Sequence, residues 1–549
     1  MNRPVDIDQQ PASDAWVALL LLAAMAMLAI TTPRDGAFWW SDAPRHALNG
    51  VFIRDLILDF PWRDPAAYAY NYYAQHPALT ILFYPPLFYV LSAPLFALFG
   101  ATHEVALMAV FLHYAAFSWG AYRLAQLWFP VKTAAALALC LVLMPEIAFW
   151  GRQVMLELPA YAFLVWSAVH FVRHLRSGAT RSLVWAVVLL LAAMYTKISV
   201  AFLVPILGLV LWRRHGAVVW RQARTWWIVT GALIATLPLL ALTLKFGQAN
   251  VQSVSNIADS VASRTTLSGW IWYAKQWPGQ LGAPLSLFLA GLALAGFLRL
   301  RKMPQRSSVA EPGERLFLLC WLLLGYIYFS LIDLKEARHS VYLLMPLLLL
   351  IFVRLSDLGW ADRNVTICAW LAVILAGIST FAYRPVHYVD GYASAARWLV
   401  EHAPAQSTVL FSGYRDGSFI FNLRAADPDR QLHVLRADKL LLRVAVRREL
   451  GVEQKATTDQ ELMALLNSQA VHYLVVQPGF WNDLDVMRRF EAMLIANPQF
   501  ELVHEFPTSA NYQSAETKLL VWRNKAAATK RQGGQVIELP IIGRTIKQE

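Results

Sequence analysis

Long apolar stretches separated by short polar ones dominate the first 383 residues of the chain. Eleven runs have the length, or nearly the length, of the roughly 20 residues that a helix needs to cross a membrane. The pattern predicts a polytopic α-helical membrane protein with about 11 transmembrane helices. The runs are 15–31, 104–127, 133–149, 156–172, 182–195, 198–212, 226–244, 284–298, 315–332, 339–353 and 364–382.

The distribution of Lys and Arg predicts the orientation of these helices, because short cytoplasmic loops are rich in both. Four basic loops lie on one side only if 182–212 forms two short spans that turn at Thr196-Lys197. A twelfth run, 81–99, must then stay in the outer leaflet, and its Pro85-Pro86 pair fits a bent interfacial segment. We therefore place the N-terminus in the cytoplasm. The basic residues are Arg173, Arg176, Arg181; Arg213, Arg214, Arg221, Arg224; Arg299, Arg301, Lys302, Arg306; and Arg354, Arg363.

The pattern changes after about Tyr383, where short β-rich runs alternate with helical stretches. This alternation is typical of a small α/β domain. We predict a transmembrane domain over 1–383 that includes an outer loop at 32–103, an extracytoplasmic α/β domain over 384–524, and a disordered polar tail over 525–549. The predicted strands are Thr408–Ser412, Leu432–Leu435, His472–Val476, Leu502–Phe506 and Leu519–Trp522, and the predicted helices are Tyr392–His402, Glu461–Asn467 and Asp483–Asn497.

Composition supports a membrane protein and argues against several other classes. Apolar residues make up 57% of the chain and charged residues only 15%, against roughly 25% charged in soluble domains. The net charge of +12 is explained by the basic loops, so no nucleic-acid partner is implied. All three cysteines lie in apolar runs, which suggests neither a disulfide framework nor a cysteine metal site. No cofactor is implied, and a role for a divalent cation stays open.

Ionisable residues gather in the segments that this topology places on the outer face. Because such groups are costly near a membrane, their clustering favours a functional site. Four of them also have a structural explanation: Asp42 as a helix cap, Glu157 as a helix-start acid, and Lys335 with Arg338 as interfacial anchors. The members are Asp42, Arg45 and His46; Arg152 and Glu157; Lys197; and Lys335, Glu336, Arg338 and His339.

Such a set suits the transfer of a sugar from a lipid phosphate. Negative charge grows on the leaving phosphate as the glycosidic bond breaks, and fixed cations stabilise that charge. Lys197, Lys335 and Arg338 are the predicted phosphate ligands, with the Arg fork matching phosphate oxygens. Asp42 is the predicted catalytic base for the acceptor hydroxyl, and Glu157 is either the second candidate for that role or a residue that orients the acceptor.

Five motifs in the same order resemble the GT-C glycosyltransferases, in particular bacterial relatives of the protein O-mannosyltransferases and of the lipid A aminoarabinose transferase. The resemblance covers roughly residues 15–355. Two positions depart from the pattern: Glu157 stands where these families often have Asp, and Tyr84 where aminoarabinose enzymes frequently have a basic residue. The motifs are SDAPRH with Asp42, Tyr84-Pro85-Pro86-Leu87-Phe88-Tyr89, GRQVMLELPAY with Arg152 and Glu157, Tyr195-Thr196-Lys197, and Lys335-Glu336-Ala337-Arg338-His339 before Met345-Pro346.

The resemblance implies an enzyme of the bacterial inner membrane, a hexosyl- or pentosyltransferase that uses a polyprenyl-phosphate-sugar donor. Transfer would take place on the periplasmic side, with inversion, to a lipid, glycan or protein acceptor. Arg45, His46, Tyr84, Arg152 and His339 are expected to bind the acceptor or assist. The alternative is a transporter or flippase for a lipid-linked sugar, but such proteins place charges near the bilayer midplane and repeat their halves, and the sequence shows neither feature.

Overall fold

The structure is a computed structural model that describes residues 11–254, 262–299, 308–444, 448, 451–455, 458–528, 535–539 and 544–548. Its internal contacts divide the chain into two compact units. The first unit comprises Met1–Thr32, Val110–Ala241 and Val254–Val386, and the second comprises Pro33–Ala109, Leu242–Ser253 and His387–Glu549.

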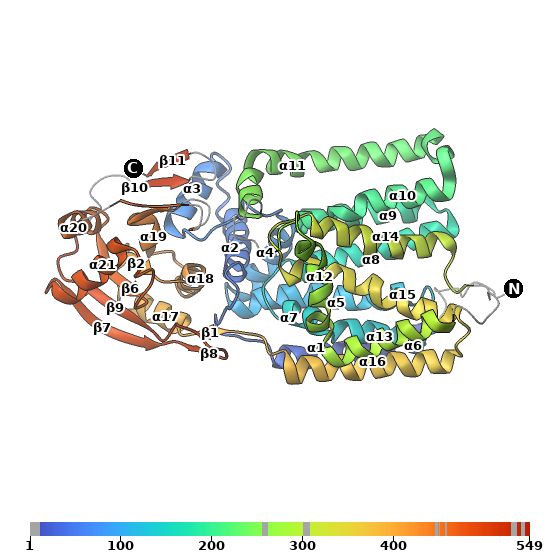
Figure 1. Cartoon of the computed structure of the whole chain (residues 1–549). Coiled ribbons are helices and arrows are strands. Elements are labelled where there is room, and N and C mark those ends of the chain that lie inside the picture. The colour runs from blue at the N-terminus through green and yellow to red at the C-terminus, as the bar shows by residue number, and fades with distance from the viewer. Residues whose placement is uncertain are drawn as a thin grey trace. The chain divides into compact units, whose positions relative to one another are not determined.

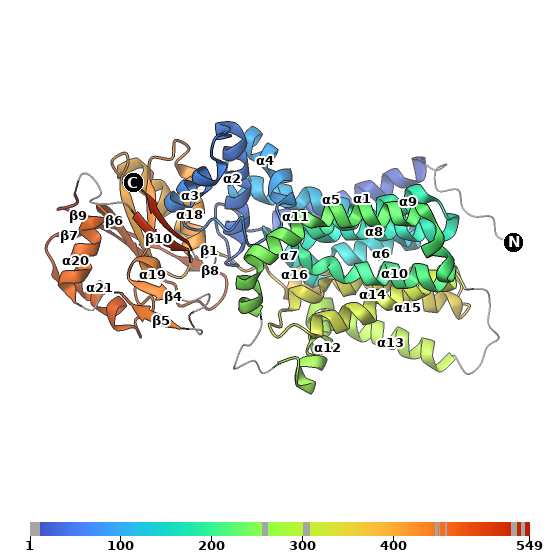
Figure 2. The same cartoon turned by 90° about the horizontal axis from the view of Figure 1, so that it is seen from above.

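The first unit is built from long helices that run side by side in both views (Figures 1 and 2). Eight of the predicted apolar runs each fall on one helix, whereas 133–149 is divided between α6 and α7, 198–212 between η1 and α10, and 339–353 between η3 and α15. The predicted break at Lys197 is confirmed, because α9 ends at Thr196. The elements are α1 (Pro11–Ile30), α5 (His103–Ala125), α6 (Val131–Val142), α7 (Pro145–Gly151), α8 (Glu157–Ser177), α9 (Thr180–Thr196), η1 (Ile198–Phe202), α10 (Leu203–His215), η2 (Gly216–Arg221), α11 (Ala223–Val254), α12 (Leu267–Leu281), α13 (Ala283–Arg299), α14 (Pro312–Ser330), η3 (Ala337–Leu343), α15 (Leu344–Asp357) and α16 (Asp362–Tyr383).

The helices confirm a polytopic membrane protein. Within the described residues, six helices are long and apolar enough to cross a membrane, or up to eight if each of two bent pairs is one span. The bends measure 62° between α6 and α7 and 114° between α12 and α13. Three shorter apolar helices lie at Asp14–Ile30, Leu87–Phe99 and Thr180–Thr196. The total of about 11 spans and their orientation stay predictions, and the basic residues Arg301, Lys302 and Arg306 lie outside the described residues.

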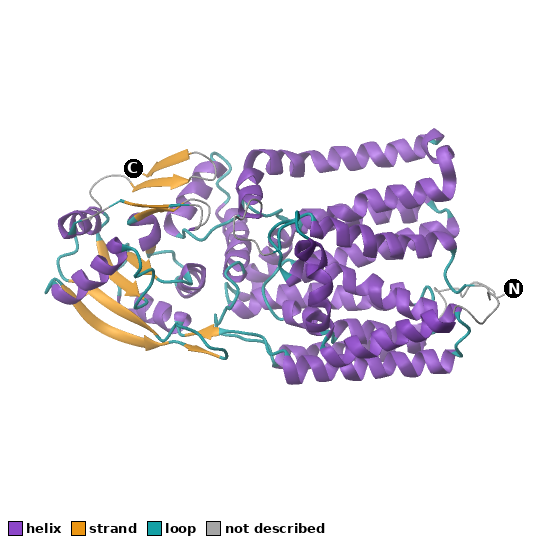
Figure 3. Ribbon diagram, viewed as in Figure 1, coloured by secondary structure: helices purple, strands orange, loops and turns teal. Residues whose placement is uncertain are grey.

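The second unit joins the first long loop to the C-terminal region. Its five-stranded sheet has the order β3-β2-β6-β9-β7 (Figure 3). β2 pairs in parallel with β3 and β6, and β9 pairs antiparallel with both β6 and β7. The elements are α2 (Ala43–Asp59), α3 (Pro65–Gln75), α4 (Leu87–Phe99), β1 (Val389–Asp390), α17 (Tyr392–His402), β2 (Thr408–Ser412), α18 (Asp416–Ala426), β3 (His433–Arg436), α19 (Ala437–Leu440), β4 (Leu442–Val444), β5 (Val452–Gln454), α20 (Asp459–Ser468), β6 (Val471–Val476), α21 (Asp485–Ala496), β7 (Phe500–Pro507), β8 (Ser509–Ala510) and β9 (Lys518–Asn524).

The predicted α/β alternation in this region is confirmed, and α17 and β2 have the predicted bounds. Its core packs Leu410 of β2 and Leu474 of β6 with Phe490 and Leu494 of α21. Helix α18 was missed. It carries Asp416, Asn422 and Arg424 on a buried face, and such polar positions hide the apolar period that normally marks a helix.

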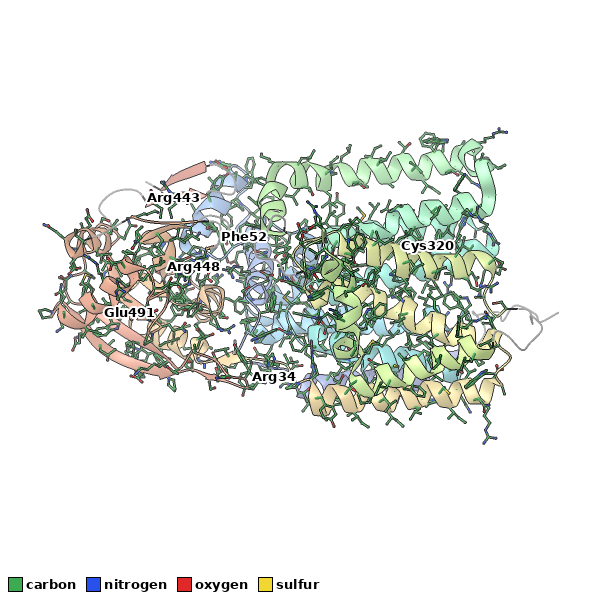
Figure 4. The ribbon with its side chains drawn as sticks, in the orientation of Figure 1. Arg34, Phe52, Cys320, Arg443, Arg448 and Glu491 are labelled. Atoms are coloured by element: carbon green, nitrogen blue, oxygen red, sulfur yellow. The ribbon has the colours of Figure 1, made fainter. Side chains whose placement is uncertain are left out.

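The loop that we assigned to the transmembrane domain makes its contacts within the second unit instead. Phe52 of α2, labelled in Figure 4, lies edge-on to Tyr72 of α3, with ring centroids 5.1 Å apart. Tyr72 in turn donates a hydrogen bond to Asp55, which pairs with Arg424 of α18 at 2.7 Å. Polar contacts of this kind between 33–109 and the C-terminal region explain the grouping.

The predicted disorder of the tail is wrong for two short segments. β10 (Gln535–Leu539) and β11 (Arg544–Gln548) form an antiparallel pair. Gln535-Val536-Ile537 and Thr545-Ile546 include β-branched residues, which favour strands even in a polar stretch.

Candidate active site

A buried carboxylate with two cations forms the centre of the charged cluster in the first unit. Lys197 Nζ lies 2.5 Å from Glu157 Oε1, and Arg338 Nη1 lies 3.6 Å from the same oxygen. The Glu157 side chain is fully buried, whereas Lys197 and Arg338 keep 14% and 12% of their side chains exposed. The cations therefore retain some access to solvent or ligand, while the acid between them has none.

Local structure explains why these residues meet. Glu157 opens α8, where the positive end of the helix dipole favours a carboxylate. Lys197 follows α9 in extended conformation, with φ −152° and ψ 115°, so its side chain leaves the helix axis at the turn. Arg338 lies in the first turn of η3, after the extended residue Glu336. Three chain turns thus supply the three side chains.

Two further residues surround Arg338. Its Nε donates a hydrogen bond to Glu336 Oε2, and its guanidinium carbon lies 5.8 Å from the centroid of the Trp150 ring. Glu336 also lies 3.7 Å from His339 Nε2. Two acids, Glu157 and Glu336, therefore fix the guanidinium in place, which limits the side-chain entropy that binding of an anion would otherwise cost.

Lys335 lies beside this cluster and is held by different partners. Its Nζ donates to the carbonyl of Ser330 at 2.5 Å and lies 5.5 Å from the centroid of the Tyr273 ring. Burial lowers the pKa of Lys335 to about 8, although the charge of Asp333 favours the protonated form. This lysine consequently changes charge within a range of pH that an assay can reach.

Arg152 makes no ion pair with Glu146, although the two are only six residues apart in the chain. Arg384 Nη2 lies 2.7 Å from Glu146 Oε2 instead, and Trp150 Nε1 donates to Glu146 at 2.6 Å. The Arg152 guanidinium donates to the carbonyls of Ala148 and Arg384 and to the hydroxyl of Thr31. Arg152 thus ties loop ends together, and its predicted assistance in the site stays untested.

Asp42 lies in the second unit at the N-cap position of α2, half-buried. Its side chain makes no capping hydrogen bond, whereas Asp64 at the start of α3 accepts one from the Ala67 amide at 2.8 Å. A polar residue at an N-cap normally stabilises its helix by accepting such a hydrogen bond from a backbone amide. Capping therefore does not explain the carboxylate of Asp42.

Two tyrosines contact His46, the next predicted residue of this segment. Its Nδ1 lies 2.8 Å from the Tyr89 hydroxyl, and its ring meets Tyr84 edge-on at 4.7 Å between centroids. Arg45 pairs with Asp416 at 2.7 Å and donates to the carbonyl of Ser41.

Sequence reasoning gave no role to Glu336, Tyr89 or Asp416, although Glu336 and Tyr89 lie within the motifs that carried the resemblance. Asp416 had no such signal, because its partner Arg45 is 371 residues away in the chain. Within the described residues, no group of three or more His, Cys, Asp and Glu side chains is arranged to hold a metal ion.

Comparison with known proteins shows which proteins share this architecture. Residues 84–241 match the family model described as dolichyl-phosphate-mannose-protein mannosyltransferase. Apo ArnT from Cupriavidus metallidurans is 14% identical, with a TM-score of 0.59 over 94% of this chain and all of that chain. Its form bound to undecaprenyl phosphate gives 13% identity and a TM-score of 0.57, with the same coverage of 94% and 100%. No curated protein sequence matches.

A second solved protein is also similar. The apo oligosaccharyltransferase from Archaeoglobus fulgidus is 13% identical, with a TM-score of 0.51 over 93% of this chain and 76% of that chain. Together the comparisons show that the chain has the GT-C fold of membrane glycosyltransferases, as the resemblance predicted. Within that fold, the likeness to ArnT extends over the full length of the ArnT chain.

Proposed function

We propose that this protein moves a sugar from a polyprenyl-phosphate-sugar donor to an acceptor hydroxyl, with inversion at the anomeric carbon. We further propose that transfer takes place on the periplasmic face of the bacterial inner membrane. The observation that carries the proposal is the cluster of Glu157, Lys197 and Arg338, in which a fully buried acid holds two partly accessible cations.

In this proposal the cations stabilise the leaving lipid phosphate. As the bond between the anomeric carbon and the phosphate oxygen breaks, negative charge grows on the phosphate. Lys197 and Arg338 are already oriented by Glu157, so they meet that charge without reorganising. Lys335 adds a third cation. Together with the two acids Glu157 and Glu336, the three cations give the cluster one net positive charge.

Asp42 acts as the base in the proposal. The acceptor hydroxyl transfers its proton to the Asp42 carboxylate while its oxygen forms the new bond to the anomeric carbon. The phosphate leaves from the opposite face of the sugar with the bonding electrons, which inverts the configuration. A positioned base of this kind contributes on the order of 10² to 10⁴ in rate. Glu157, bonded to two cations, serves in this scheme to hold them.

The comparisons support the donor class. ArnT has been solved with undecaprenyl phosphate, and the matching family is described by transfer of mannose from dolichyl phosphate. Both names contain a polyprenyl phosphate, the group that Lys197 and Arg338 would hold. The sugar and the acceptor are left open by this argument.

The experiment is mass spectrometry of envelope glycolipids and glycoproteins from a deletion strain complemented with variants of two matched aspartates. Asp42→Ala should abolish the sugar modification without removing a helix cap, since the Asp42 side chain makes no capping hydrogen bond. Asp64→Ala should lower stability by about 1 kcal/mol through loss of a cap but keep the modification. An unchanged glycan profile in the Asp42→Ala strain would overturn the assignment of Asp42.

A further inference from the structure

The edge of the α/β sheet at which ligands usually bind is occupied by the chain's own first loop. In open α/β sheets, that site lies outside the carboxyl ends of the parallel strands. Here the chain leaves β2 at Ser412 and enters α18 at Asp416, and it leaves β3 at Arg436. At both places, residues of the 33–109 segment contact the side chains of the α/β domain.

A chain of alternating charges crosses this edge. Asp416 Oδ2 lies 2.7 Å from Arg45 Nη2 and 2.8 Å from Arg436 Nη1, and Arg436 continues to Asp438 at 2.7 Å. All four side chains are largely buried, with exposed fractions between 11% and 17%. Burial alone would raise the pKa of Asp416, but Arg436 and Arg45 overcome it and hold the pKa below its ordinary value.

A second set of contacts holds the backbone before Asp42. The Arg415 guanidinium donates to the carbonyl of Trp39 while also binding Glu516 at 2.8 Å and the Tyr512 hydroxyl at 2.7 Å. Asn422 Nδ2 donates to the carbonyl of Gly36 at 3.2 Å. Gly36 has φ +72°, and a Cβ there would lie 2.0 Å from Asn422 Oδ1, so the approach depends on glycine.

These contacts bracket Asp42 on both sides. Trp39 precedes it by three residues and Arg45 follows it by three, and both are held by consecutive residues, Arg415 and Asp416. Gly417 completes the contact, since a Cβ there would lie 3.1 Å from Arg45 Nη1 and from Pro44 Cγ. The start of α2 therefore rests directly on the start of α18.

We infer that Arg415 and Asp416 are positioning residues that orient Asp42 for the proposed transfer. The α/β domain is then part of the catalytic apparatus, with its ligand-binding edge converted into a support for the 36–45 segment. This inference rests on the proposed function. It assigns to the C-terminal domain the task of fixing a carboxylate more than 370 residues earlier in the chain.

The test compares two aspartates that share Arg436. Asp416→Asn removes the charge that binds Arg45, whereas Asp438→Asn removes a charge of similar burial whose ion pair with Arg436 involves no residue of the 36–45 segment. Both variants leave Arg436 one acidic partner, and only Asp416→Asn also removes the ion pair of Arg45. Amide hydrogen exchange over 39–49 and steady-state kinetics with a polyprenyl-phosphate-sugar donor are measured on the full-length protein in nanodiscs.

For Asp416→Asn we expect faster exchange over 39–49 and a kcat at least about tenfold lower with the donor KM unchanged, since misplacement of a reacting group is costly in rate. The acid limb of the kcat profile, which reports the base, should also move. Asp438→Asn should change none of the three. Equal behaviour of the two variants, or unchanged exchange in Asp416→Asn, would overturn the inference.

Two outcomes separate this inference from the proposed function. Faster exchange in Asp416→Asn together with no sugar transfer by the wild type would defeat the proposed function and with it the catalytic purpose of the support. Full transfer by the wild type with unaltered Asp416→Asn kinetics would defeat only the positioning role. If Asp416→Asn fails to fold, Asn422→Ala takes its place, because it removes only the contact with Gly36. We then expect the same changes in exchange and kinetics, each of smaller size.

Discussion

The two units use ionic contacts in opposite ways. In the first unit, Glu157 holds Lys197 and Arg338 where three turns of a helical framework meet. In the second unit, ion pairs such as Arg424 with Asp55 and Arg45 with Asp416 join two segments that are distant in the chain. The first arrangement concentrates charge at a site, and the second distributes it as a means of assembly.

The free energy lost when an ion pair is broken depends on how deeply the pair is buried. A buried ion pair contributes little net stability relative to apolar packing, yet removal of one partner is strongly destabilising. Buried pairs in the second unit should therefore affect folding when broken. Lys197 and Arg338 are as buried as Arg45 and Asp416, so removal of either cation should also lower stability, because the fully buried Glu157 loses a partner. In addition, it should weaken ligand binding. Substitutions in each kind of pair test this division.

The largest expected effect concerns the assembly of the second unit. Arg424→Ala should lower the free energy of unfolding by about 3 kcal/mol, because Asp55 would stay buried with Arg54 as its remaining ionic partner. Thermal unfolding of the purified protein, followed by fluorescence or calorimetry, measures the loss. A change below about 1 kcal/mol would show that this pair does not hold the two segments together.

The next effect concerns the proposed site. Lys197→Met should lower kcat/KM for the donor by about 10² to 10³, comparable to the loss of one oxyanion-stabilising donor. Arg176→Met is the matched control, since Arg176 pairs with the fully buried Glu314 at 2.5 Å elsewhere in the same unit. That variant should lose stability and keep its donor kinetics. Similar kinetic losses in both variants would indicate general damage to the helical framework.

A smaller effect should appear as a dependence on pH. Burial lowers the pKa of Lys335 to about 8, so its ammonium is present below that pH and is lost above it. If Lys335 binds the donor phosphate, the donor KM should rise as the pH increases from 8, by at most about tenfold per unit. Lys335→Arg remains charged and should show a flat profile. A parallel rise in both proteins would assign the titration to another group.

The smallest effect is expected for an exposed pair. Arg397 lies 2.7 Å from Asp35, with side chains 50% and 65% exposed, and it joins the same two segments as Arg424. Exposed pairs contribute about 0 to 1 kcal/mol, so Arg397→Ala should hardly change thermal unfolding. A loss as large as that of Arg424→Ala would contradict the view that burial decides the role of each pair.

Much of this architecture could be predicted from local sequence. Apolar runs located the membrane helices, and the need to place basic loops on one side located the break at Lys197. The α/β domain followed from alternating strand and helix patterns, with α17 and β2 at their predicted bounds. These features depend on neighbours in the chain, so local patterns contain them.

Contacts between distant segments were beyond such reasoning. The sequence offered no sign that Asp416 binds Arg45 or that Arg384, rather than Arg152, binds Glu146. It also hid α18, because polar side chains that bind the first loop interrupt its apolar period. The convergence of Glu157, Lys197 and Arg338 was predicted only as a set of residues on one face, and their bonding pattern came from the structure.

The most direct test of the central claim is the preference of the purified protein for polyprenyl phosphate over polyprenol, which differ only in the phosphate. The wild type and Arg176→Met should bind the phosphate at least about tenfold more tightly, a difference of about 1.4 kcal/mol. Lys197→Met should lose most of this preference. An unchanged preference in Lys197→Met and in Arg338→Met would contradict the assignment of these cations to the lipid phosphate.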